Sequence, residues 1–180
     1  MKQPVFEGVA TALVTPFKNG TLDIPTLQKL IDFQITNGVD ALVVCGTTGE
    51  ASTMSQAEQL SAISNAVQYA AGRCKIIAGT GSNCTAHAVE MSRLASAIGA
   101  DAVLVVTPYY NKCTQSGLVA HYSAIADAIP VPVIAYNVPS RTGVNISVDT
   151  YRELSHHPNI NGVKEAAAGT AKIARTLDVC

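Results

Sequence analysis

A lysine near the end of the chain lies in a predicted short strand, where its amine could act as a nucleophile. Lys164 belongs to residues 161–166, at the last of a series of predicted strand positions. Most lysines are solvated, so the ordinary interpretation is a surface group at a strand end. A desolvated site would instead lower its pKa from about 10.4 and free the neutral amine for attack on a carbonyl. Lys164 is therefore a candidate for Schiff-base chemistry.

Hydroxyl groups follow three other apolar segments. They lie in Gly-Thr-Thr-Gly-Glu at 46–50, Thr-Pro-Tyr-Tyr-Asn-Lys at 107–112 and Ala-Tyr-Asn-Val-Pro-Ser-Arg-Thr-Gly at 135–143. Taken singly, the first is typical of a capped turn and the second of an aromatic rim. Together they offer phenols and hydroxyls for proton transfer, and Arg141 would suit an anionic substrate.

Six apolar segments recur at a spacing near thirty residues, and each is followed by a stretch with helical periodicity. The segments are 8–17, 41–46, 75–80, 102–108, 131–137 and 160–165. Helix signals include Asp23 before Pro25 and a capping box from Ser55 to Glu58. Further helices are expected over 85–98, 116–128, 147–155 and 169–179. The pattern predicts six βα units with a parallel sheet covered by helices.

Two α/β architectures fit this alternation, an open doubly wound sheet and a barrel. No G-x-G-x-x-G follows the first segment, which favours a TIM (β/α)8-type barrel. A complete barrel needs about 250 residues and eight strands. The 180 residues supply only six βα units, so we expect one partial barrel domain over 1–180, truncated at its C-terminal side, with two open sheet edges.

Composition excludes several classes of partner. The net charge is −1 with 14% charged residues, which gives no footprint for nucleic acid. Apolar runs fall short of the roughly 18 residues of a membrane span, and the first residues lack the features of a signal or transit peptide. The five cysteines show no ligand spacing, so we expect free thiols and no metal. These features predict a cytoplasmic protein that acts on a small molecule.

Four motifs in order identify a resemblance: Gly-Thr-Thr-Gly-Glu at 46–50, Pro-Tyr-Tyr-Asn-Lys at 108–112, Tyr-Asn-Val-Pro-Ser-Arg-Thr-Gly at 136–143 and Gly-Val-Lys-Glu-Ala at 162–166. The chain closely resembles the dihydrodipicolinate synthase family of class I pyruvate aldolases. The resemblance implies a cytoplasmic homotetramer, a dimer of dimers, that condenses pyruvate with L-aspartate 4-semialdehyde in lysine and diaminopimelate biosynthesis. It implies no metal and no diffusible cofactor.

The resemblance also implies roles for the matching residues. Lys164 would form the Schiff base with pyruvate, and Tyr136 would donate and accept protons. Thr47 would relay protons between Tyr136 and Tyr110, which in the family reaches in from a neighbouring subunit.

Thr48 would hold the pyruvate carboxylate, and Arg141 would face the carboxylate of the semialdehyde. N-acetylneuraminate lyase, a relative with the same Schiff base and another acceptor, is expected to have Ser-Thr where this chain has Thr47 and Thr48. That pair, with Tyr110 and Arg141, favours the synthase. The remaining alternative is a catalytically silent fragment whose open strand edges pair with a partner.

The regulatory residues of the family match less well. Members inhibited by lysine are expected to carry a serine, two histidines and an acid at four positions where this chain differs. Those positions hold Ala51, Gln56, Gln59 and His87, whereas Asn83 and Tyr109 match. Loss of feedback inhibition by lysine is the hypothesis that follows.

Overall fold

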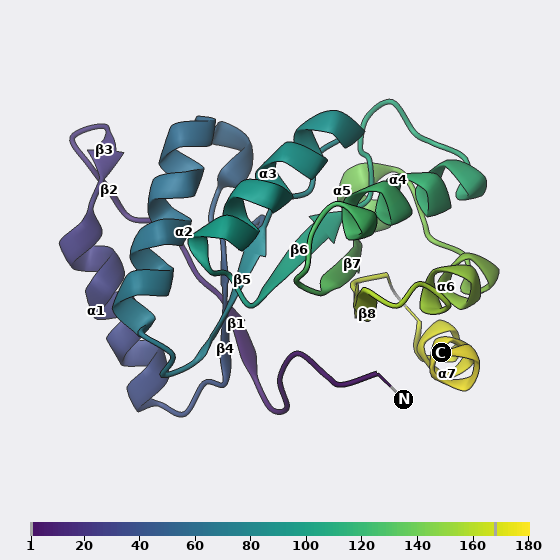
Figure 1. Ribbon diagram of the computed structural model, residues 1–180, viewed down its shortest axis with the longest axis horizontal. Helices are drawn as coiled ribbons and strands as arrows, with labels where there is room; N and C mark the ends of the chain where they lie inside the picture. The colour runs from purple at the N-terminus through teal and green to yellow at the C-terminus, as the bar shows by residue number, and fades with distance from the viewer. Residues whose placement is uncertain (1, 168) are drawn as a thin grey trace.

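The six predicted strands form one parallel sheet whose order in space is their order along the chain (Figure 1). The computed structural model describes residues 2–167 and 169–180. The strands are β1 (Ala10–Ala12), β4 (Ala41–Val44), β5 (Lys75–Gly79), β6 (Ala102–Val106), β7 (Val133–Asn137) and β8 (Ile160–Glu165). The first is much shorter than the predicted 8–17. A small hairpin of β2 (Phe17–Lys18) and β3 (Thr21–Leu22), which the sequence analysis did not predict, follows it.

The predicted helices are present and pack along one face of the sheet (Figure 1). They are α1 (Ile24–Thr36), α2 (Gln56–Ala70), α3 (Thr85–Ile98), α4 (Gln115–Asp127), α6 (Val148–Ser155) and α7 (Thr170–Val179). Two short helices were not predicted, η1 (Ala51–Thr53) and α5 (Pro139–Thr142). The capping box is confirmed, because Ser55 accepts from the Glu58 amide while the Glu58 carboxylate accepts from the Ser55 amide.

The sheet curls, as a barrel requires. A single inner cavity of about 430 Å³ touches Ala10 on the first strand and Lys164 on the last, with Val43, Ile77 and Leu104 between them. Only a sheet bent around its own face can bring its two edge strands to one cavity. Among the described residues, β1 and β8 are each paired on one side only. The predicted barrel with six of its eight units is confirmed.

The N-terminal arm contributes to the lining of this inner cavity. Its residues Val5 and Phe6 pack on the inner face of the sheet. The Lys2 ammonium donates to the carbonyls of Ser155, His157 and Ile160 at 2.5–2.7 Å. These contacts tie the beginning of the chain to the entrance of β8.

A β-bulge decides which way the side chains of β8 point. Val133 pairs with Ile160, but the next residue, Ile134, pairs with Gly162, so Asn161 is an extra residue in the ladder. Ile160 belongs to the core under the helices. Regular alternation from Ile160 would turn Lys164 toward the helices as well, whereas the bulge reverses the phase and turns it toward the inner face.

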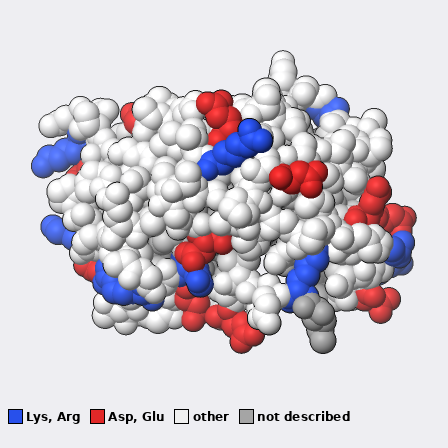
Figure 2. Space-filling view, in the orientation of Figure 1, with Lys and Arg blue, Asp and Glu red and all other residues white. Residues whose placement is uncertain are grey.

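Charged side chains are scattered over the face of the molecule seen in Figure 2. Figure 2 shows both signs dispersed between broad uncharged areas, in keeping with the net charge of −1. No helix within the described residues is long and apolar enough to cross a bilayer.

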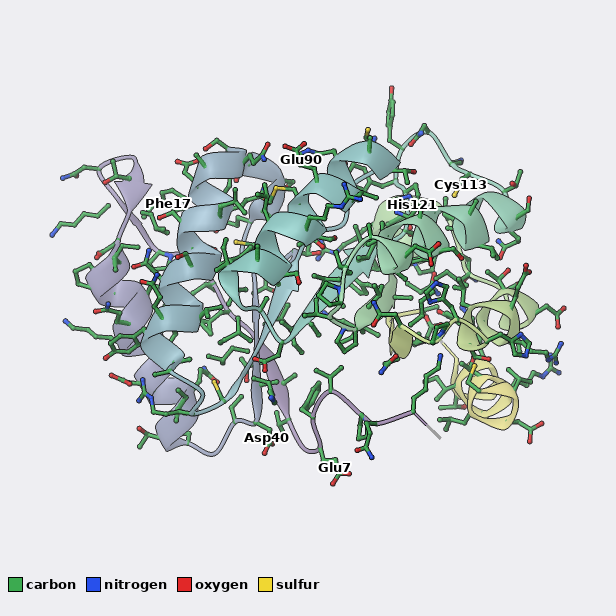
Figure 3. All side chains as sticks on the ribbon, in the orientation of Figure 1. Glu7, Phe17, Asp40, Glu90, Cys113 and His121 are labelled. Carbon is green, nitrogen blue, oxygen red and sulfur yellow. The ribbon has the colours of Figure 1, made fainter. Side chains whose placement is uncertain are left out.

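His121 lies on α4 (Figure 3), and its burial makes folding stability depend on pH. Its ring is 3% exposed, Nδ1 lies 2.9 Å from the Thr85 hydroxyl, and Nε2 has no partner among the described residues. Burial lowers the pKa of His121 to about 4 from 6.5. Between pH 6.5 and about pH 4, His121 is protonated in the unfolded chain but neutral in the folded chain. The free energy of unfolding therefore falls as the pH falls.

We expect the free energy of unfolding, from urea titration, to drop by about 2 kcal/mol between pH 7 and pH 5 because of His121 alone. The variant His121→Gln should remove this slope, and His156→Gln, at an exposed position, should keep it. An unchanged slope in His121→Gln would contradict the assignment.

Candidate active site

The carboxyl ends of the middle strands surround a strand-end cavity of about 410 Å³. Thr47 enters it from the loop after β4, and Tyr136 from β7. Arg141 enters from α5, and Tyr109 from the loop after β6. The structure thus brings together three of the six predicted site residues, from segments about ninety residues apart in the chain.

Lys164 meets Tyr136 where the strand-end cavity and the inner cavity adjoin. The two residues are directly paired in the β7–β8 ladder, and the Lys164 ammonium lies 4.3 Å from the centre of the Tyr136 ring. Lys164 lines the inner cavity, whereas Tyr136 lines the strand-end cavity. The amine is therefore held over a phenol at the junction of two spaces that a small substrate could enter.

The Lys164 side chain is exposed at the open side of the sheet, but its ammonium is partly desolvated. This desolvation lowers the pKa of Lys164 below its ordinary value and increases the fraction of neutral amine near pH 7. None of the ion pairs among residues 2–167 and 169–180 involves Lys164. An amine without a carboxylate partner is suited to nucleophilic attack.

Tyr136 is 7% exposed and packs with the inner-face core, so its ring has a fixed position. Thr47, by contrast, is exposed in the loop that follows β4. Tight backbone crossings shape that loop: Cys45 has a φ of 56°, and a Cβ at Gly79 would lie 2.1 Å from the Cys45 carbonyl oxygen. The Cys45 thiol is buried, which raises its pKa to about 12 and leaves it unreactive.

Tyr110 and Thr48 lie apart from the other predicted site residues. Tyr110 is 90% exposed in the loop between β6 and α4, with a φ of 71°, and lines neither cavity. Thr48 is exposed and lines neither cavity. Left-handed backbone costs energy in a tyrosine and is therefore uncommon at that residue type.

Three of the four positions at which lysine-inhibited relatives are expected to differ, Ala51, Gln59 and His87, line the strand-end cavity. The Gln59 amide donates to the carbonyls of Ala51 at 2.9 Å and Met54 at 3.3 Å. The Gln56 amide donates to Glu90 at 3.4 Å. Both glutamines are thus used in contacts within the chain.

A polar network behind Lys164 was missed in the sequence analysis. The Glu165 carboxylate, on the next residue of β8, accepts hydrogen bonds from Asn137, Tyr151 and the Ala167 amide, and pairs with Lys172 at 2.8 Å. The only signal in the sequence was an acid directly after the candidate lysine, and alternation along a strand would have sent the two to opposite faces.

Within the described residues, no group of three or more His, Cys, Asp or Glu side chains is arranged to hold a metal ion. The five cysteines are free thiols, as predicted.

Comparison with known proteins gives consistent results. Residues 5–180 match the profile of the dihydrodipicolinate synthetase family. The 4-hydroxy-tetrahydrodipicolinate synthase of Thermoanaerobacter sp. (strain X514) is 55% identical over 172 residues, which cover 95% of this chain and 58% of the relative.

Solved structures agree in fold. A dihydrodipicolinate synthase from Acinetobacter baumannii complexed with pyruvate has a TM-score of 0.93 and 47% identity, over 95% of this chain and 59% of that one. A monomeric dihydrodipicolinate synthase variant has a TM-score of 0.95 and 42% identity, over 97% and 59%. The chain therefore spans less than two thirds of the length of each of these relatives.

Proposed function

This chain belongs to the dihydrodipicolinate synthetase family, and from that premise we propose that it carries the Schiff-base chemistry of a 4-hydroxy-tetrahydrodipicolinate synthase. The proposed reaction condenses pyruvate with L-aspartate 4-semialdehyde, as a step toward lysine and diaminopimelate in the cytoplasm. The observation that carries the proposal is the Lys164 ammonium held 4.3 Å from the centre of the Tyr136 ring.

The chemistry follows from these two groups. The neutral Lys164 amine attacks the ketone carbon of pyruvate, and loss of water from the resulting carbinolamine leaves an iminium ion. Tyr136 donates the proton that the departing hydroxyl needs, and Thr47, on the same cavity, relays protons to it. The iminium makes the adjacent methyl group acidic, so one methyl proton passes back to the Tyr136 phenolate left by the dehydration, and the resulting enamine can attack the aldehyde carbon. The proposed electron sink is this iminium, which requires no metal or diffusible cofactor.

The remaining predicted residues have places in the same proposal. Thr48 would bind the pyruvate carboxylate, and Arg141, which lines the strand-end cavity, would bind the carboxylate of the semialdehyde. Tyr110 would complete the proton relay of a neighbouring subunit, and its 90% exposure and left-handed backbone are compatible with such a role. We propose a tetramer, although one related structure is a monomeric variant.

The direct test is to trap the intermediate. The purified protein is incubated with pyruvate and borohydride, and the product is analysed by intact mass and peptide mapping. We expect one reduced adduct per chain, located at Lys164. A folded sample without any adduct would overturn the proposal for this chain and would favour the silent fragment.

Lysine is not expected to inhibit the reaction. Where inhibited relatives are expected to hold two imidazoles, Gln56 and Gln59 offer amides that are already bonded within the chain. Millimolar L-lysine should therefore change the rate of adduct formation by less than about twofold, since an effector without differential contacts shifts no equilibrium. Half-inhibition at submillimolar lysine would show that the site is retained.

A further inference from the structure

The two neighbouring residues Lys164 and Glu165 occupy opposite faces of β8. Because of the bulge at Asn161, Lys164 faces the inner cavity, while Glu165 faces the helices, opposite Asn137 in the ladder. A rigid strand links the two side chains, so whatever fixes one of them also fixes the direction of the other.

Glu165 is fixed by four donors from four parts of the fold. Its Oε1 accepts from the Asn137 amide on β7 and from the Ala167 backbone amide, both at 2.8 Å. Its Oε2 accepts from the Tyr151 hydroxyl on α6 and pairs with the Lys172 ammonium on α7, also at 2.8 Å. A carboxylate has about four acceptor positions, so this one is fully used.

The donors are themselves held in place. Tyr151 is 1% exposed and Asn137 is fully buried. Lys172 also donates to Asn145 at 2.7 Å and lies 5.2 Å from the centre of the Tyr151 ring. Burial opposes ionisation of Glu165, but the hydrogen bonds from Lys172, Ala167, Tyr151 and Asn137 prevail and lower its pKa below the ordinary value.

On the opposite face, the described residues provide little to hold Lys164. Its ammonium belongs to no described ion pair and touches the Tyr136 ring, and β8 has a paired neighbour on one side only. The orientation of the carboxyl end of β8 therefore depends on β7 and on the hydrogen bonds of Glu165.

We propose that Glu165, clamped by Tyr151, Lys172, Asn137 and the Ala167 amide, is a positioning residue that aims Lys164 over Tyr136. The catalytic purpose of this positioning rests on the proposed function. The position of the Lys164 amine itself can be tested without any substrate. Loosening the clamp lets the end of β8 move, and the amine swings from the Tyr136 ring toward water.

Two variants loosen the clamp to different degrees. Glu165→Gln removes the charge that pairs with Lys172. Tyr151→Phe removes a single hydroxyl donor and leaves every charge in place, so it remains informative if the first variant fails to fold. The matched control is Tyr69→Phe, because Tyr69 donates to Asp32, which also pairs with Arg73 at 2.8 Å, in a similar network between α1 and α2.

The readout is the pH dependence of trace acetylation at Lys164, followed by peptide mass spectrometry, which needs no pyruvate. Displacement into water raises the pKa of the Lys164 amine, so both clamp variants should shift the pH midpoint of labelling upward by about 0.5 to 1 pH unit. At a fixed pH below the midpoint, Lys164 should then be labelled about three- to tenfold more slowly. Loss of the Glu165 charge without any movement of Lys164 would instead shift the labelling midpoint downward, because a nearby negative charge favours the protonated amine. Loss of a hydrogen bond elsewhere in the fold, as in Tyr69→Phe, would leave the labelling midpoint of Lys164 unchanged.

The outcomes separate this proposal from the proposed function. The positioning role of Glu165 would be overturned if the labelling midpoint of Lys164 were the same in the parent, in Tyr151→Phe and in Tyr69→Phe. This conclusion would hold whether or not pyruvate forms an adduct. An upward shift in the clamp variants with no pyruvate adduct in the parent would support positioning and reject the enzymatic role of this chain. Where the parent does form an adduct, both clamp variants should also trap pyruvate three- to tenfold more slowly at that pH.

Discussion

Replacement of Lys164 by methionine is expected to abolish the pyruvate adduct and any condensation activity, a loss of at least about a hundredfold. Methionine keeps a long unbranched side chain over Tyr136 but has no amine, so no iminium can form. The unfolding midpoint should change little, because Lys164 is exposed and takes part in no described ion pair. The measurement is intact mass after borohydride treatment, with urea unfolding alongside.

Lys75→Met is the matched control for that experiment. Lys75 begins β5 and pairs at 2.8 Å with Asp101 on an exposed surface, away from both cavities. Its replacement should leave the adduct intact. An adduct that persists in Lys164→Met would assign the nucleophile to another amine.

Tyr136→Phe is expected to slow adduct formation by about a hundredfold or more while leaving the ring packing intact. The hydroxyl is the proton donor in the proposed dehydration step, and general acid catalysis is typically worth about 10²- to 10⁴-fold. The ring lies in the inner-face core, so phenylalanine fills the same space. The measurement is the rate of trapping at saturating pyruvate.

The control for the phenol is Tyr122→Phe. Tyr122 is fully buried, and its hydroxyl donates to the Val105 carbonyl at 3.1 Å, under the helices and away from either cavity. Its loss should cost about 1 kcal/mol of stability and leave the trapping rate unchanged. Equal rates for Tyr136→Phe and the parent would exclude the phenol from the reaction.

Local signals predicted the elements because the sequence and the structure agree at short range. The capping box at Ser55 and Glu58 formed as expected, and α3 ends before Gly99, whose φ of 105° suits glycine. The continuous apolar run that became β6 is buried on both sides, as parallel strands are. These features depend on neighbours within a few residues, which a single sequence displays.

The site was predicted only partly, because its geometry depends on contacts distant in the chain. Thr47, Tyr136 and Arg141 share one cavity, and Lys164 meets Tyr136, but Tyr110 lies exposed and apart. The Glu165 network draws donors from β7, α6 and α7, and no local pattern identifies such a set. The sequence analysis also overestimated the length of β1, which has three residues, and missed the four-residue helix α5.

The bulge at Asn161 has a consequence for how this protein can evolve. Strand side chains alternate between the two faces of a sheet, so the number of residues between Ile160 and Lys164 decides which face Lys164 points to. One more residue in that interval, with no second bulge to absorb it, would exchange the two faces, so that Lys164 would turn toward the helices and Glu165 toward the inner face. Point substitutions in this interval change size and polarity, but an insertion reverses the chemistry of the pocket. We therefore expect natural variation here to conserve length more strictly than residue type.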